Sequence, residues 1–207
     1  MRRTIVLAAL LAAGCGTTGP AEPPPPSPTG ERGSALDEAA IQTAWWTWAA
    51  GSPPATNPVM DLTGEDCAVD QPATGPWFLA GTFGETATRR CAAPAGRMLV
   101  APVVNRVARD ATGCRVFLSG ASGAVAVDGE TQTLLRWSGS DITVRGVADN
   151  PVSDKAGRFS GRACGLWVAI APLPPGDHTI TIRGDAGTLS VSVDYHLTVS
   201  PADPSAA

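Results

Sequence analysis

Histidine is scarce in this sequence, and its basic residues do not cluster. The chain of 207 residues has two histidines, His178 and His196, and neither stands at the spacing of a metal-ligand motif. No serine lies in the Gly-x-Ser-x-Gly turn of the α/β-hydrolases, so a triad of that kind is not predicted. No run of five basic residues occurs and the net charge is −4, which argues against nucleic acid as a partner.

Two further patterns are missing. No pair of cysteines has the C-x-x-C spacing of a structural zinc site, so the five cysteines are not expected to bind zinc. Beyond residue 15, no apolar run approaches the roughly 18 residues that would be needed to cross a bilayer. The composition therefore favours a globular domain with neither a zinc centre nor a membrane-spanning segment.

The N-terminal segment has the pattern of a bacterial lipoprotein leader. Arginines at positions 2 and 3 precede an apolar run at 5–13, and small residues at 13 and 14 precede Cys15, as in a lipobox. We therefore expect lipidation of Cys15 and an extracytoplasmic domain anchored to the bacterial cell membrane. The alternative is an ordinary secretory leader with an incidental cysteine.

The other four cysteines form an even set, as expected in an oxidising compartment. Four cysteines allow three disulfide connectivities. Sequential pairing suits two successive subregions of one domain, and it favours Cys67–Cys91 and Cys114–Cys164.

Composition divides the chain into four segments. Residues 1–15 form the leader, 16–33 a proline-rich tether, 34–200 a single domain and 201–207 a disordered tail. The tether cannot pack a core and is expected to hold the domain clear of the bilayer.

One helix is predicted at 34–49, at the start of the domain. Ser34 can cap it, and Ile41, Ala44, Trp45 and Trp48 recur on one face. Trp46 lies off that face and is expected to be more exposed.

The rest of the domain is predicted to be mainly β. Short strands are expected at 77–83, 97–104, 115–119, 124–127, 132–137, 142–147, 166–171, 178–183 and 189–199. The last of these alternates strictly between apolar and polar residues, which indicates a sheet with one solvated face. The stretch 146–161 reads as a long exposed loop. This pattern predicts a disulfide-braced β-sandwich, immunoglobulin-like or jelly-roll-like, with one N-terminal helix.

Two segments resemble known families. The motifs Trp45-Trp46-x-Trp48, Asp61-x-Thr63-Gly64-x-x-Cys67 and Trp77-Phe78-Leu79-Ala80-Gly81-Thr82 resemble, in this order, an uncharacterised family of secreted bacterial proteins and lipoproteins. That resemblance implies no activity. The stretch 172–182 (PLPPGDHTITI) is similar to the turn and strand of bacterial immunoglobulin-like domains, which implies a sandwich.

An acidic cluster and two tryptophans are the candidates for chemistry. The carboxylates of Asp61, Glu65, Asp66 and Asp70 suit a calcium ion or an acid–base pair acting on a sugar, although a solvated loop has the same composition. Trp46 and Trp137 are candidates for stacking on sugar rings, with core packing as the alternative.

A ligand site is predicted in the loop 57–71 and not on the final strand, because hydrogen-bonding side chains gather there beside Cys67. These side chains are Asn57, Asp61, Thr63, Glu65, Asp66 and Gln71. No cofactor is predicted apart from the calcium alternative.

Three functions fit these observations. The leading one is a membrane-anchored, non-enzymatic binding module whose partner is a cell-wall glycan or an envelope protein. The second is a carbohydrate-active or other hydrolytic lipoprotein that uses carboxylates of the segment 61–70. The third is a structural envelope protein that binds other proteins.

Overall fold

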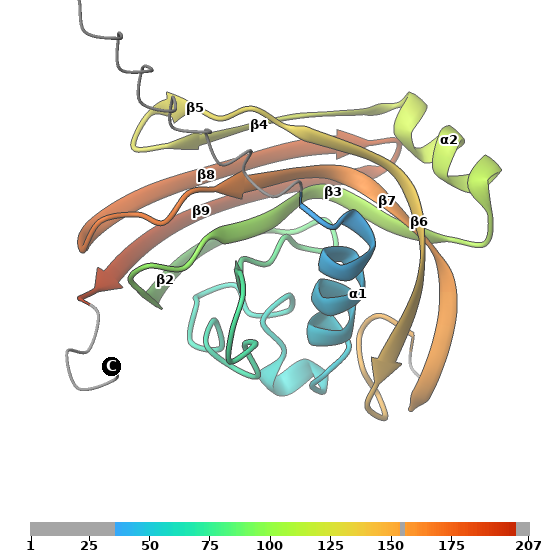
Figure 1. The fold of residues 1–207 in the computed structure, drawn as a ribbon, viewed down its shortest axis with the longest axis horizontal. Helices are drawn as coiled ribbons and strands as arrows, with labels where there is room; N and C mark the ends of the chain where they lie inside the picture. Colours follow the sequence, from blue (N-terminus) through green and yellow to red (C-terminus); the bar gives the residue numbers. More distant parts are fainter. Residues whose placement is uncertain (1–35, 154–155, 202–207) are drawn as a thin grey trace, which may run out of the picture. The chain divides into compact units, whose positions relative to one another are not determined.

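The computed structural model describes residues 36–153 and 156–201. Within them, two β-sheets pack face to face and an α-helix covers the free face of one sheet (Figure 1). The predicted mainly β fold, a sandwich braced by two disulfides with an N-terminal helix, is confirmed. The leader, Cys15, the tether and the tail beyond residue 201 lie outside the described residues.

The inner sheet has four strands and the outer sheet has five. The inner sheet runs in the order β1 (Trp77–Phe78), β3 (Leu99–Ala108), β7 (Gly157–Ile170), β6 (Leu135–Gly146). The outer sheet runs in the order β2 (Thr86–Pro94), β9 (Leu189–Ser200), β8 (Gly176–Ala186), β4 (Ala121–Val127), β5 (Glu130–Thr131). The pairs β1–β3 and β2–β9 are parallel, and the remaining pairs are antiparallel.

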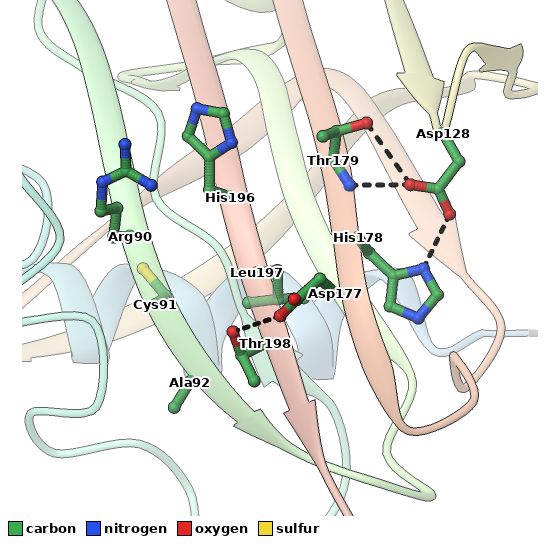
Figure 2. Close-up of a pocket in the computed structure, with 10 residues that line it drawn as sticks. All are labelled: Arg90, Cys91, Ala92, Asp128, Asp177, His178, Thr179, His196, Leu197 and Thr198. Atoms are coloured by element: carbon green, nitrogen blue, oxygen red, sulfur yellow. Dashed lines mark hydrogen bonds and ion pairs between the residues drawn. The ribbon is translucent and has the colours of Figure 1, made fainter.

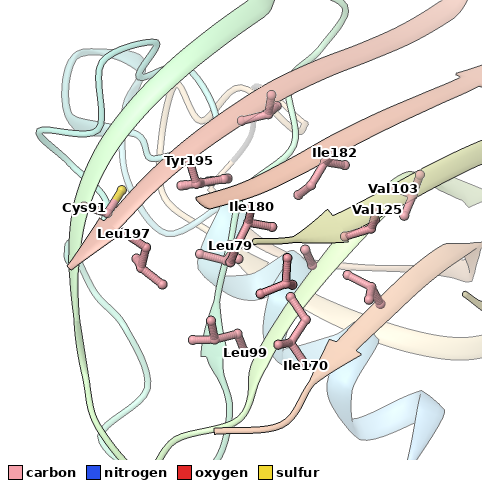
Figure 3. Close-up of a cluster of buried hydrophobic side chains, with 14 of the residues drawn as sticks. Leu79, Cys91, Leu99, Val103, Val125, Ile170, Ile180, Ile182, Tyr195 and Leu197 are labelled. Atoms are coloured by element: carbon pink, nitrogen blue, oxygen red, sulfur yellow. The ribbon is translucent and has the colours of Figure 1, made fainter. Parts of the chain in front are cut away.

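The centre of the inner sheet, in β3 and the second half of β7, is buried on both faces. In β3, Leu99 and Ala101 face the outer sheet, whereas Val100 between them packs toward the helix α1 (Glu38–Ala49). Figure 3 shows the core between the sheets, where Leu99 and Ile170 lie opposite residues of the outer sheet. Burial on both faces explains why β3 and β7 each contain six consecutive buried residues instead of an alternating pattern.

The outer sheet, by contrast, buries one face only. In β9, Val191, Val193, Tyr195, Leu197 and Val199 point into the core, and the residues between them are exposed or partly exposed. The alternation predicted for 189–199 is therefore confirmed. The solvated face of this sheet carries the site described below.

The helix α1 begins later than the sequence suggests. Asp37 is its N-cap, and its carboxylate accepts a hydrogen bond from the backbone N–H of Ala40 at 3.0 Å. The expectation that Trp46 is exposed is wrong, because its side chain is only 6% exposed, whereas Ala44 is exposed. The helix packs on β6 and β7 of the inner sheet, and a second side of it is buried against β3 and the segment that follows β1.

Two other expectations need correction, and one strand was missed. The segment 115–119 is part of a second helix, α2 (Ala111–Ser119), which Asp110 caps and which buries Cys114 and Leu118. The strand β2 was not predicted. The stretch 146–161 is not loop throughout, because β7 begins at residue 157. A short 3-10 helix, η1, lies at Pro54–Thr56.

The predicted disulfide pairing is confirmed. Cys67 bonds to Cys91 and Cys114 to Cys164, with Cα–Cα separations of 5.9 and 5.8 Å. The first bridge joins the loop 57–71 to β2, and the second joins α2 to β7. Within residues 36–153 and 156–201, no helix has the length and apolar content needed to cross a membrane.

Candidate functional site

Two of the polar side chains in the loop 57–71 hold the chain's own backbone. The side chain of Asn57 is fully buried, and its Nδ2 donates to the carbonyl oxygens of Ala49 and Ser52, each at 2.9 Å. Gln71 donates to the carbonyls of Cys67 and Phe78 and accepts from the N–H of Phe78 at 2.9 Å. Both amides therefore stabilise the loop and have little capacity left for a ligand.

The carboxylate of Asp61 is used in the same way. It accepts from the backbone N–H groups of Thr63 at 2.8 Å and of Gly64 and Asp66 at 2.9 Å each. Burial alone would raise the pKa of Asp61, but the hydrogen bonds from Asp66, Gly64 and Thr63 outweigh it and lower the pKa below 3.8. The charged carboxylate thus orders a turn, as Asp side chains do in loops.

The other acidic residues of the cluster do not complete a metal site. Glu65 and Asp70 are exposed and Asp66 is half-buried. Across the described part of the chain, no group of three or more His, Cys, Asp or Glu side chains is placed to hold a metal ion. The geometry therefore adds no support to the calcium hypothesis for Asp61, Glu65, Asp66 and Asp70.

Arg89 fixes this loop to the outer sheet, and the sequence analysis did not identify it. The residue is fully buried, although it is charged. Its guanidinium donates at 2.6 to 3.2 Å to four carbonyl oxygens and one hydroxyl, those of Asp61, Val59, Ala80, Gly81 and Tyr195. Burial also raises the pKa of Tyr195, whose hydroxyl donates to the carbonyl of Ala80. The sequence carried no clear signal for Arg89, because a charged residue at an inward position breaks the apolar alternation of β2.

The two tryptophans proposed as stacking platforms are core residues. Trp46 is 6% exposed and Trp137 is 8% exposed. The ring of Trp137 lies 5.1 Å from that of Trp167, and the ring of Trp46 lies 5.1 Å from that of Trp45. Because aromatic neighbours cover them, neither ring presents the open face that stacking on a sugar requires.

An open depression of about 560 Å³ lies on the solvated face of the outer sheet, and we call it the outer-face depression (Figure 2). It spans β2, β9, β8 and the turn between β4 and β5. It is lined by Arg90, Cys91, Ala92, Asp128, Asp177, His178, Thr179, His196, Leu197 and Thr198.

Strand register brings two basic side chains together in this depression. Arg90 of β2 pairs with His196 of β9, which in turn pairs with Thr179 of β8. Figure 2 shows Arg90 and His196 side by side, both projecting from the same face of the sheet. Both residues are exposed, and neither side chain makes a hydrogen bond or ion pair within residues 36–153 and 156–201. Their donors are therefore available to a ligand.

The other end of the depression is already organised by hydrogen bonds. Asp128 accepts from the N–H of Thr179 and from Nδ1 of His178, both at 2.7 Å. Nε2 of His178 lies 2.9 Å from the carbonyl oxygen of Pro174. Both partners of the ring are acceptors, so both bonds form only with the doubly protonated imidazolium. The hydrogen bond to Asp128 accordingly raises the pKa of His178, and the same bond lowers the pKa of Asp128.

These contacts define what the depression can do chemically. A guanidinium beside an imidazole donates hydrogen bonds to an anionic group, whereas the hydroxyl of Thr179 on the next strand donates to Asp128 at 3.4 Å. Asp177 is also held, because it accepts from the hydroxyl of Thr198 at 2.7 Å. His178 is committed at both ring nitrogens and is poorly suited to act as a general base.

Comparison of the chain with protein-family models, curated proteins and solved structures finds no match. The resemblance of the motifs between Trp45 and Thr82 to a family of secreted bacterial proteins therefore stays a prediction. The prediction of a ligand site in the loop 57–71 also stays a prediction. The outer-face depression lies partly on the final strand, where no ligand site is predicted from the sequence because its solvated face offers mainly serine and threonine.

Proposed function

We propose that this protein is a lipid-anchored, extracytoplasmic binding module whose ligand occupies the outer-face depression. Its two disulfides indicate an oxidising, extracytoplasmic compartment. The lipobox ending at Cys15 and the proline-rich segment 16–33 support a membrane anchor followed by a spacer. Such an arrangement holds a rigid sandwich within reach of envelope polymers.

The ligand class that fits best is an acidic glycan of the cell envelope. The observation that carries this proposal is the exposed guanidinium of Arg90, which has no partner within the described residues and stands beside His196. A guanidinium binds carboxylate or phosphate through two parallel hydrogen bonds. The carboxylates of Asp128 and Asp177 line the same depression, but they already accept from His178, Thr179 and Thr198, so the proposal rests on Arg90 and His196.

The hydrolytic alternative has weaker support. Asp61 uses both carboxylate oxygens on backbone N–H groups, which leaves it poorly suited to serve as an acid or a base. Glu65 and Asp70 are exposed and line none of the walls of the outer-face depression. Binding without catalysis is the function that these contacts favour.

The proposal is tested with an acidic polymer of known chemistry. We expect the purified protein to bind polygalacturonate but not the neutral polymer dextran, and added salt should weaken this binding. Arg90→Ala should reduce the affinity for polygalacturonate about tenfold or more, as expected for a lost charge-assisted hydrogen bond. Arg158→Ala, which removes an exposed arginine of β7 outside the depression, is the matched control and should bind as the parent does. Equal binding by the two variants would overturn this assignment.

The membrane anchor has a separate test. Cys15→Ala should abolish labelling of the protein by radioactive palmitate and shift it out of the membrane fraction, because two or three acyl chains are needed for stable anchoring. A Cys15→Ala protein that stays in the membrane fraction at full yield would contradict lipidation at this residue. That result would leave the glycan-binding test unaffected.

A further inference from the structure

We infer that a second, enclosed site between α1 and β3 binds an acyl group, meaning a carbonyl or carboxylate oxygen that carries a methyl-sized apolar group. This site, which we call the acyl pocket, has a volume of about 70 Å³. It is lined by Trp45, Trp46, Val59, Gly81, Thr82, Phe83, Pro102, Val103, Val104, Asn105, Leu189 and Val191. It shares no lining residue with the outer-face depression, so the inference does not depend on the proposed function.

Two buried N–H groups belong to residues that line this pocket and have no partner in the protein. They are Nε1 of Trp46 and Nδ2 of Asn105, two of six buried side-chain nitrogen or oxygen atoms without a hydrogen bond among the described residues. Trp46 is 6% exposed. A buried donor without an acceptor is unfavourable and uncommon in native proteins. Because the two donors belong to different elements and their residues line one cavity, an oxygen acceptor is the chemical group that would complement them.

Both residues are held in place by their neighbours. The ring of Trp46 packs edge-on against Trp45, with centroids 5.1 Å apart, and Nε1 of Trp45 is anchored on the carbonyl of Leu79 at 3.1 Å. Asn105 lies against Gly165 of β7, where a Cβ would come within 2.9 Å of the Cα and Cβ of Asn105. The pocket is therefore pre-formed, which lowers the cost of ordering it around a ligand.

Size and lining select the ligand class. Much of the remaining wall is apolar, including Val103, Val104 and Leu189, and this suits a methyl group. The volume admits a small pendant group but not a whole sugar ring. Two sources share this chemistry: the acetamido group of an N-acetylated sugar, and free acetate.

The test uses the indole N–H resonances of the full-length protein in solution. Titration with N-acetylglucosamine and, separately, with sodium acetate should shift the Nε1–H resonance of Trp46, with a Kd of roughly 1 mM or weaker for groups this small. Glucosamine, which lacks the acetyl group, should cause no shift. A response to both acetyl compounds identifies a pendant acetyl group as a ligand, and a response to acetate alone identifies free carboxylates. A Trp46 resonance that moves with neither compound would mean that the pocket holds only water, and it would overturn the inference.

Variants separate binding from folding. Trp46→Phe removes the N–H and keeps an aromatic ring, so the folded variant should bind acetate tenfold or more weakly, with some loss of stability from the smaller ring. Trp77→Phe removes a different buried indole N–H that also lacks a partner and does not line the pocket, and it should bind acetate as the parent does. Asn105→Ala removes the second donor and provides an independent test should Trp46→Phe fail to fold. Parent-like binding by both Trp46→Phe and Asn105→Ala would also overturn the inference.

Discussion

The loop 57–71 and the outer-face depression contain similar polar residue types, but they use them differently. In the loop, Asn57, Asp61 and Gln71 bond to the chain's own backbone. In the depression, Arg90 and His196 project from paired strands and have no partner within the described residues. The comparison shows that a high density of polar side chains does not by itself identify a binding surface. What matters is whether the hydrogen-bonding capacity of those side chains is already used.

The contrast is sharpest at two consecutive residues of β2. Arg89 points inward and is fully buried, whereas Arg90 points outward and is exposed. Alternation along a strand places neighbouring side chains on opposite faces, so one guanidinium stabilises the fold and the next is available to a ligand. The predictions below test this division, beginning with the largest expected effect.

Arg89→Ala should destabilise the protein most. It removes one donor from each of four carbonyl oxygens and from the hydroxyl of Tyr195. The carbonyl of Ala80 and the hydroxyl of Tyr195 keep their bonds to each other's residue, but the carbonyls of Val59, Asp61 and Gly81 lose the guanidinium, at a cost of about 1–3 kcal/mol for each buried group left unsatisfied. We expect a loss of on the order of 4 kcal/mol or more, a large part of a typical domain's stability. Denaturant unfolding measures it, with Arg90→Ala as the matched control, which should change stability by about 0.5 kcal/mol or less. Equal effects of the two substitutions would refute the proposed division of roles.

The next largest effect is expected from removing the bridge that joins the loop to β2. Replacing both Cys67 and Cys91 by Ser removes the disulfide between two residues that are 24 positions apart. Loop-closure entropy predicts that the free energy of unfolding falls by roughly 3.5 kcal/mol. If the loop and the depression are independent, a variant that remains folded should still bind polygalacturonate, because Cys91 lines the depression but supplies none of its charged groups. Loss of binding by a fully folded variant would show that the loop and the depression are coupled.

Asp61→Ala should have a moderate effect. It removes the acceptor for three backbone N–H groups in a partly exposed turn, and we expect a loss of about 1–2 kcal/mol. Because the folded protein lowers the pKa of Asp61, its contribution is present above the ordinary value of 3.8 and is lost as the pH falls through the lowered pKa. Unfolding measured between neutral and acidic pH should therefore show a smaller difference between parent and variant at the acidic end. A ligand or calcium response that disappears in Asp61→Ala would instead favour the loop as a binding site.

The smallest effect is expected at His178. The hydrogen bond to Asp128 raises the pKa of His178 in the folded protein. The contribution of His178 to the free energy of unfolding is therefore complete below pH 6.5, its ordinary pKa, and is lost as the pH rises through the raised pKa. His178→Gln should remove this pH dependence of the stability. The variant and the parent should therefore be most similar in stability at alkaline pH. Thermal unfolding from pH 5 to pH 9 measures the difference. If the thermal midpoints of parent and variant differ by the same amount at every pH, that result would contradict the imidazolium bridge between Asp128 and Pro174.

Much of the architecture could be read from local patterns. Strict alternation in 189–199 identified the solvated sheet, and sequential pairing identified both disulfides. The helix α2 was missed because its nine residues are short and apolar enough to read as a strand, and its position depends on the bridge to β7. The strand β2 was missed because its buried positions alternate among Ala87, Arg89, Cys91 and Ala93, and an inward arginine breaks the apolar pattern.

The sequence by itself determined the fold class, the disulfide framework and the segment expected to carry the lipid, because periodicity, cysteine parity and the leader pattern are local properties. Only the tertiary structure decided which polar groups already have hydrogen-bond partners within the protein. The parallel pairing of β2 with β9 joins residues more than one hundred positions apart, and it alone brings Arg90 beside His196. The same long-range packing buries Arg89 and covers Trp46 and Trp137. Neighbours that are distant in the sequence decide whether a polar group is buried and whether its hydrogen-bonding capacity is used. The sequence alone does not show which residues become neighbours, so it cannot reveal either property.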